Sequence, residues 1–238
     1  MSDNKFSFKQ FELHQELCAM KVGTDSVLLG AWAILPEKGR ILDIGAGTGI
    51  LSLMAAQRTL HTSITAIEID TPASRQAQEN VMNSTWNDRI EVVNKDFTQV
   101  ADGITQPFDS IISNPPYFEK SLLSPDAART TARHTNSLSY DAIFSLARNI
   151  IAPHGNLSLV LPAELYKEVN NTAMLYGWGA SRLTWVRTTP RKNPKRALCE
   201  WRRNHFAPCT QEMLTIHTAT GEYSNEYILL TKEFYLHF

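Results

Sequence analysis

The chain has 238 residues, of which 43% are hydrophobic and 20% are charged, and its formal net charge is −1. A chain of this length and composition is typical of one large α/β domain, which can bury enough apolar surface to fold without disulfides or a structural metal. The polar start, the lack of a long apolar run and the three widely spaced cysteines argue against a signal peptide, a membrane-spanning helix and a zinc site. We therefore expect a metal-free cytoplasmic protein, with no indication of an obligate protein partner.

Short apolar runs alternate with helical patterns from Arg40 onward, as in an open parallel sheet with helices on both faces. The predicted strands are 41–44, 64–68, 90–93, 108–112, 157–161 and 183–186, with 197–201 returning antiparallel. Helices are predicted over 27–32 after a Thr24-Asp25-Ser26 cap, from Thr71 as N-cap, from about 139 to 152 and from about 163 to 177. Residues 213–238 are expected to hold a short strand, a turn and a final helix or strand. We interpret residues 1–238 as a single domain, with 1–20 as a short N-terminal extension.

A glycine-rich turn, Asp43-Ile44-Gly45-Ala46-Gly47-Thr48-Gly49, follows the first of these strands. Glycines let the backbone approach a ligand closely, and ligands bind at the carboxyl ends of parallel strands. The GxGxG spacing differs from the GxGxxG of dinucleotide sites. Asp43 suits a ligand amine, and Glu68 after the second strand suits two ribose hydroxyls. Asp96 and Phe97 after the third strand suit the amine and the face of an adenine. Together these groups describe S-adenosylmethionine.

The fourth strand ends in Asn114-Pro115-Pro116-Tyr117. The two prolines force the chain out of the sheet and stiffen the turn. The Asn114 side chain and the Pro115 carbonyl are then two acceptors that can hold the hydrogens of one planar amine and expose its lone pair. Tyr117 offers an aromatic face for a planar substrate. The motif thus predicts methyl transfer to an amino nitrogen.

These motifs resemble the class I methyltransferases that modify amino nitrogens. More narrowly, the chain is similar to the bacterial tRNA(Val) adenine-37 N6-methyltransferase family. The residues that carry this similarity are Phe8-Lys9-Gln10-Phe11, the segment 18–25, Leu28-Leu29-Gly30-Ala31-Trp32, Tyr227 and Phe234-Tyr235-Leu236. The agreement is dense from Phe8 to about Pro162 and sparse from Tyr166 to Gln211, where RNA discrimination is expected.

The resemblance implies a class I (Rossmann-like) fold of the S-adenosylmethionine-dependent methyltransferases, with a mostly parallel seven-stranded sheet. It implies an enzyme that methylates N6 of an adenine in tRNA, and a segment over 21–24 that closes over the methionine part of the cofactor. The catalytic candidates are Asn114, Pro115, Pro116 and Tyr117. The cofactor candidates are Lys21, Gly23, Thr24, Asp43, Gly45, Ala46, Gly47, Gly49, Glu68, Ile69, Asp96, Phe97 and Asn114.

A basic stretch from Arg182 to Arg203 contains eight Lys and Arg residues and one acidic residue, so its net charge is +7. The rest of the chain carries a net charge of −8. A parallel strand over 183–186 would place its following turn on the same edge as Asn114. We therefore expect Arg191, Lys192, Lys195 and Arg196 to meet RNA phosphates. A second polar loop after Tyr117, with Arg129 and Arg133, is an alternative RNA contact.

Other substrates and roles remain open at this point. The same Asn-Pro-Pro-Tyr motif can bind a glutamine amide of a protein, or an adenine of ribosomal RNA or DNA. The chain could also be an inactive RNA-binding module on a methyltransferase scaffold. Protein glutamine methyltransferases in general carry a helical domain ahead of the segment 21–24, but only about 20 residues precede that segment here. The glutamine substrate is therefore disfavoured.

Overall fold

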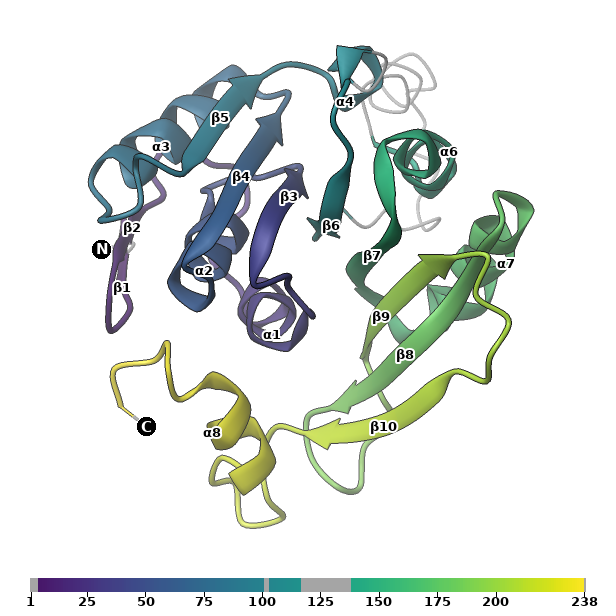
Figure 1. Cartoon of the computed structure of the whole chain (residues 1–238). Coiled ribbons are helices and arrows are strands. Elements are labelled where there is room, and N and C mark those ends of the chain that lie inside the picture. Colours follow the sequence, from purple (N-terminus) through teal and green to yellow (C-terminus); the bar gives the residue numbers. More distant parts are fainter. Residues whose placement is uncertain (1–3, 101–102, 117–137, 238) are drawn as a thin grey trace, which may run out of the picture.

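An eight-stranded sheet forms the centre of the described part of the chain, which comprises residues 4–100, 103–116 and 138–237 of a computed structural model (Figure 1). The strand order is β10-β8-β9-β7-β6-β3-β4-β5. The strands are β3 (Lys38–Ile44), β4 (His61–Glu68), β5 (Ile90–Asn94), β6 (Phe108–Ser113), β7 (Ile151–Pro162), β8 (Trp178–Arg187), β9 (Arg196–Arg203) and β10 (Thr210–Thr215). Only β9 runs antiparallel to its neighbours in this sheet.

The predicted mostly parallel α/β sheet is therefore confirmed, but the expected number of seven strands is wrong for the residues described. The eighth strand is β10, which pairs in parallel with β8 at the edge of the sheet. Its first four residues are exposed. A short strand was expected within residues 213–238, but β10 begins at Thr210, and its exposed start lacks the apolar run by which buried strands are recognised.

Helices cover both faces of the sheet (Figure 1). They are α1 (Thr24–Trp32), α2 (Ile50–Arg58), α3 (Thr71–Met82), α4 (Phe97–Val100), α6 (Tyr140–Ile150), the short 3-10 turn η2 (Ala163–Leu165), α7 (Tyr166–Leu175) and α8 (Asn225–Thr231). Ile41 packs in a core with α1, α2 and α8, whereas its neighbour Leu42 packs in a second core with α6 and α7. This alternation follows from the pleat of β3, which turns successive side chains to opposite faces.

Two helices begin earlier than the sequence pattern predicts. The N-cap of α1 is Gly23, so Thr24, Asp25 and Ser26 form the first turn of the helix and do not cap it. The N-cap of α3 is Asp70, whose carboxylate accepts a hydrogen bond from the Ala73 N–H at 3.0 Å. In α6 the predicted start is confirmed, with Ser139 as N-cap.

The N-terminal segment is a hairpin of β1 (Lys5–Ser7) and β2 (Glu12–His14) that packs onto the domain. The rings of Phe8 and Phe11 stack at 4.6 Å, and Tyr235 from the C-terminal segment lies 6.0 Å from Phe8. The backbone N–H of Lys9 donates to the Phe234 carbonyl at 2.8 Å. The two ends of the described chain thus share one aromatic cluster, which accounts for the two terminal motifs noted in the sequence.

Candidate active site

The glycine-rich turn lies between β3 and α2, at the carboxyl end of the parallel strands. Gly45 and Gly47 have φ angles of 73° and 55°, in the left-handed region that other residues avoid. The N–H groups of Gly45 and Ala46 donate to the Ile67 carbonyl at 2.9 and 3.0 Å, which ties the turn to β4. A Cβ built on Gly45 or Gly47 would meet no heavy atom within 4 Å. The glycines are therefore required by the backbone conformation, and the space beside them is open to a ligand.

Two cavities meet at this turn, because Gly45 lines both of them. The larger one has a volume of about 310 Å³ and the smaller one about 160 Å³. Predicted residues on the wall of the larger cavity are Lys21, Gly23, Gly45, Ala46, Gly47, Asn114, Pro115 and Pro116. Predicted residues on the wall of the smaller cavity are Gly45, Ile69, Asp96 and Phe97. An elongated ligand can therefore pass from one cavity to the other across Gly45.

Glu68 joins the end of β4 to the glycine turn. Its Oε2 accepts a hydrogen bond from the Gly47 N–H at 2.8 Å, and its Oε1 accepts one from the Asp70 N–H at 2.9 Å. The residue is 8% exposed. A carboxylate has about four acceptor positions, so these two bonds fix its orientation and leave capacity for two ligand hydroxyls.

Asp43 lies beneath the turn and is not part of either cavity wall. It is fully buried, and its Oδ2 accepts hydrogen bonds from the Ser52 N–H at 3.1 Å and from the Ser52 hydroxyl at 2.8 Å. Burial raises the pKa of this carboxyl from 3.8 to about 7, the Ser52 bonds oppose the rise, and the nearby charge of Glu68 adds to it. No described protein group bonds to its Oδ1. The side chain therefore anchors the start of α2 and keeps one unsatisfied acceptor.

The smaller cavity is lined by apolar side chains together with the polar residues Lys95, Asp96 and Thr98. Phe97 is 3% exposed, and the half-exposed Ile69 lies on the same wall. The Oδ1 of Asp96 accepts hydrogen bonds from the N–H and the hydroxyl of Thr98, both at 2.8 Å. A cavity with apolar walls and a positioned carboxylate suits an aromatic heterocycle that carries an amine.

Asn114 lies on the wall of the larger cavity, directly after β6. Its Nδ2 donates to the hydroxyl of Ser26 at 2.9 Å. The preceding Ser113 hydroxyl donates to the Ile44 carbonyl at 2.6 Å, which fixes this segment against β3 next to the glycine turn. With the amide nitrogen directed at Ser26, Oδ1 is the atom of this side chain that can accept a hydrogen bond from a substrate amine.

Several predicted residues lie elsewhere. Thr24, Gly49 and Glu68, like Asp43, are absent from both cavity walls, and Gly49 is instead the N-cap of α2. Tyr117, Arg129 and Arg133 fall outside the described residues. Asp25 and Ser26 were expected to cap a helix and were not assigned to the site, yet both line the larger cavity. Their closeness in the chain to the predicted cofactor residues Gly23 and Thr24 was the one available signal.

The turn between β8 and β9 lies at the same edge of the sheet as the larger cavity. The Nε of Arg196 forms an ion pair with Asp25 Oδ2 at 2.7 Å, and Asp25 lines that cavity. The side chains of Arg191, Lys192 and Lys195 are exposed. The turn therefore lies at the same edge of the sheet as Asn114, while its role toward RNA remains a prediction.

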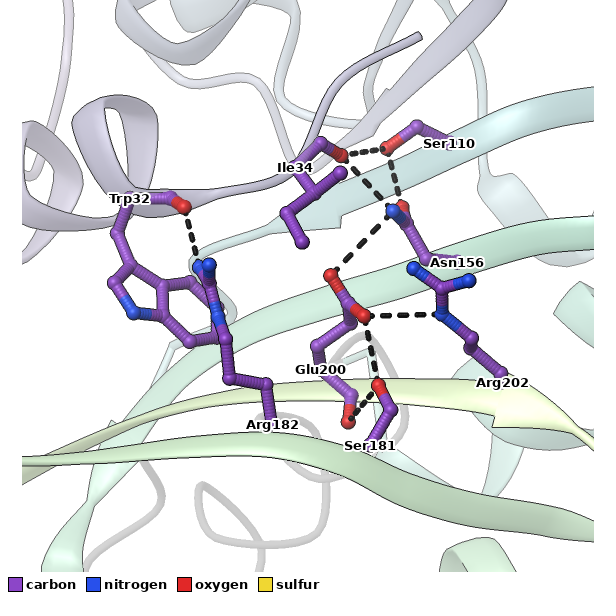
Figure 2. A network of polar contacts seen from close by, with 8 residues as sticks. All are labelled: Trp32, Ile34, Ser110, Asn156, Ser181, Arg182, Glu200 and Arg202. Carbon is purple, nitrogen blue, oxygen red and sulfur yellow. Dashed lines mark hydrogen bonds and ion pairs between the residues drawn. The ribbon is translucent and has the colours of Figure 1, made fainter. Parts of the chain in front are cut away.

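Two of the eight basic residues in the stretch from Arg182 to Arg203, namely Arg182 and Arg202, make contacts within the fold away from the turn at the cavity edge (Figure 2). The guanidinium of Arg182 lies 3.6 Å from the ring centroid of Trp32 and donates to the Trp32 carbonyl at 2.5 Å. The Nε of Arg202 forms an ion pair with the buried Glu200 at 3.1 Å. Arg182 and Arg202 are thus engaged by Trp32 and Glu200, whereas Arg191, Lys192 and Lys195 are exposed on the turn at the cavity edge.

Within the described ranges, no group of His, Cys, Asp and Glu could hold a metal ion, and no helix is long and apolar enough to cross a membrane. The three cysteines are unpaired.

Solved structures share this fold at low sequence identity. A predicted O-methyltransferase of Agrobacterium tumefaciens superimposes with a TM-score of 0.71 and 22% identity, over 88% of this chain and 96% of that chain. The ribosomal protein L11 methylase of Lactobacillus delbrueckii has a TM-score of 0.52 and 15% identity, over 76% and 77%. The fold is therefore that of the class I S-adenosylmethionine-dependent methyltransferases.

Curated relatives match nearly the whole chain. A Bacteroides thetaiotaomicron protein is 45% identical over 238 residues, which cover 100% of this chain and 99% of the relative. A Tolumonas auensis protein is 43% identical over 237 residues, 99% and 98% of the two chains. Both are named tRNA1(Val) (adenine(37)-N6)-methyltransferase, and the methyltransferase small domain family matches residues 18–174. The chain belongs to the methyltransferase small domain family and, within it, to the tRNA1(Val) (adenine(37)-N6)-methyltransferases.

Proposed function

We propose that this protein transfers a methyl group from S-adenosylmethionine to the N6 amine of an adenine in tRNA, with adenine 37 of tRNA(Val) as the target. The observation that carries the proposal is the Asn114 amide on the wall of the larger cavity, oriented by Ser26 at 2.9 Å, beside the open glycine turn. The names of the relatives support the choice of substrate. A tRNA substrate in turn implies a cytoplasmic location.

The residues present fit S-adenosylmethionine. The open space beside Gly45 and Gly47 would hold its methionine part, together with Lys21 and Gly23. Glu68 would accept the ribose hydroxyls, and the cavity with Ile69, Asp96 and Phe97 would hold the adenine. The Oδ1 of Asp43, which bonds to no described protein group, would favour the positively charged amine of the cofactor nearby. When bound, this cofactor supplies an electrophilic methyl group on a sulfonium.

Asn114 and Pro115 would orient the substrate amine. The Asn114 Oδ1 and the Pro115 carbonyl would each accept one N–H of the adenine amine, which directs the nitrogen lone pair toward the methyl group. As the nitrogen becomes positively charged, both preset acceptors are in place to stabilise that charge, with no reorganisation at the moment of transfer. The turn with Arg191, Lys192 and Lys195 would bind RNA phosphates. Tyr117 is proposed to stack on the base, and Arg129 with Arg133 to add a further RNA contact.

Methyl-labelled S-adenosylmethionine and total tRNA test the proposal, with nucleoside analysis of the labelled fraction. We expect label in N6-methyladenosine of tRNA(Val). Asn114→Ala should lower the transfer rate about 100-fold, the scale of losing one preset polar contact, while cofactor binding persists. Asn87→Ala, at an exposed asparagine remote from both cavities, is the matched control. Label found only in protein would overturn the proposal in favour of a glutamine amide substrate.

A further inference from the structure

The first turn of α1 contacts the catalytic motif through one hydroxyl. Ser26 is the third residue of the helix and half-buried. Gly23 occupies the N-cap position and no side chain caps the helix, so the hydroxyl of Ser26 is not used for capping. Instead, its Oγ accepts the hydrogen bond from Asn114 Nδ2 at 2.9 Å, and both residues line the larger cavity.

The orientation of the Asn114 amide decides whether it can hold an amine. An asparagine amide presents an acceptor oxygen on one side and a donor nitrogen on the other, and the two arrangements have nearly the same shape. If the amide turned over, its NH2 group would face the substrate amine, and the hydrogen bond from that amine to Asn114 could not form. A partner that accepts from the nitrogen favours the arrangement in which the oxygen is presented to the substrate.

Ser26 is held in place more firmly than a residue on a loop would be. Its neighbour Asp25 forms the ion pair with Arg196 at 2.7 Å, which fastens the first turn of α1 to the start of β9. At the other end of the helix, the indole N–H of Trp32 donates to the Thr184 hydroxyl of β8 at 2.9 Å. Asn114 directly follows Ser113, the last residue of β6.

We propose that Ser26 is a positioning residue, which sets the orientation of the Asn114 amide so that its oxygen accepts from the substrate amine. The inference rests on the proposed function for the identity of that amine. Ser26 acts through Asn114 and leaves cofactor binding to other groups, so its removal should lower the rate of methyl transfer and leave cofactor affinity nearly unchanged.

A double-mutant cycle in the full-length protein tests this role, with single-turnover methyl transfer to tRNA as the readout. Ser26→Ala should lower the rate about tenfold, the equivalent of one lost hydrogen bond. In the Asn114→Ala background the same change should alter the rate by less than about twofold, because the group that Ser26 orients is gone. Ser26→Thr keeps the hydroxyl and should restore the rate to within about threefold of the parent.

Ser145→Ala is the control, since it removes another half-buried helical hydroxyl, which donates to the Ala142 carbonyl at 3.3 Å. It should leave the rate unchanged. Equal losses from Ser26→Ala in the two backgrounds would indicate a purely structural role and overturn the inference.

A second measurement does not depend on activity. The side-chain amide protons of Asn114, identified in an NMR spectrum by their loss in Asn114→Ala, should exchange with solvent faster in Ser26→Ala than in the parent or Ser26→Thr. Unchanged exchange in Ser26→Ala would also overturn the inference. If the parent failed to methylate tRNA, the proposed function would be wrong, while this measurement would still decide whether Ser26 orients the amide.

Discussion

The buried carboxyl of Asp43 should make the stability of the protein depend on pH in an unusual direction. Its pKa is raised from 3.8 to about 7 by burial. The folded protein therefore keeps this proton over a pH range in which the unfolded chain has already lost it. Stability rises with pH only where the unfolded state binds more protons, so here the contribution of Asp43 must fall as the pH increases from about 4 to about 7.

The size of the effect follows from the two pKa values. At about 1.4 kcal/mol for each pH unit, the difference between 3.8 and about 7 corresponds to about 4 kcal/mol, on the order of a third to most of the stability of an ordinary domain. Asp43→Asn keeps an oxygen that can accept from Ser52, and its new NH2 group takes the place of Oδ1, which bonds to no described protein group. The variant should fold and lose this part of the pH dependence.

Urea unfolding of the parent and of Asp43→Asn between pH 4 and pH 8, without cofactor, measures the prediction. The free energy of unfolding of the parent should fall relative to that of the variant across this range, by up to about 4 kcal/mol. Asp88→Asn, at an exposed carboxylate, controls for the loss of one negative charge. Parallel curves for the parent and Asp43→Asn would refute the reasoning that burial dominates this site.

Three further changes address the turn, the ribose contact and the RNA edge. Glu68→Ala should weaken cofactor binding by about 1.5–3 kcal/mol, measured by calorimetry. It should also lower the melting temperature, because the N–H of Gly47 loses its acceptor. An unaltered dissociation constant would contradict the ribose role. Gly47→Ala should cost about 1–2 kcal/mol of stability in urea unfolding, because its φ of 55° strains any other residue although the space is open. Replacing Arg191, Lys192 and Lys195 by alanine should flatten the slope of log affinity against log salt for tRNA by about 2, and equally for unrelated RNA. A constant slope would show that the turn binds no phosphate.

Local sequence patterns were sufficient for the parallel strands β3 to β8, the glycine turn and the placement of Asn114 after β6, but not for the full extent of the edge strand β10. The glycines at 45 and 47 have the positive φ angles that their spacing indicates, and the two prolines leave β6 at its carboxyl end. These features depend on residues adjacent in the chain, so their signal is present before any tertiary contact forms. Parallel strands then bring their carboxyl ends to one edge, which placed the candidate site without further information.

Other parts of the site depended on contacts between distant segments. Ser26 reaches Asn114 across 88 residues, and Arg196 reaches Asp25 across 171. A cap-like Thr-Asp-Ser sequence predicts local bonds, but Gly23 is the N-cap of the helix, and Asp25 and Ser26 bond to distant residues instead. The charge count of the basic stretch could not show that Arg182 lies on Trp32 or that Arg202 pairs with Glu200, because strand register decides which side chains face each other.

By itself, the sequence determined the class of fold, the edge of the sheet that carries the site and the type of chemistry. Glycine permits and proline enforces particular backbone conformations, and both effects are local. Only the tertiary structure decided that Asp43 lies beneath the turn as a buried acid, and that Ser26 faces the Asn114 amide. The physical reason is that burial and hydrogen-bond partnership are properties of packed neighbours. These neighbours are chosen when helices and strands far apart in the chain come together.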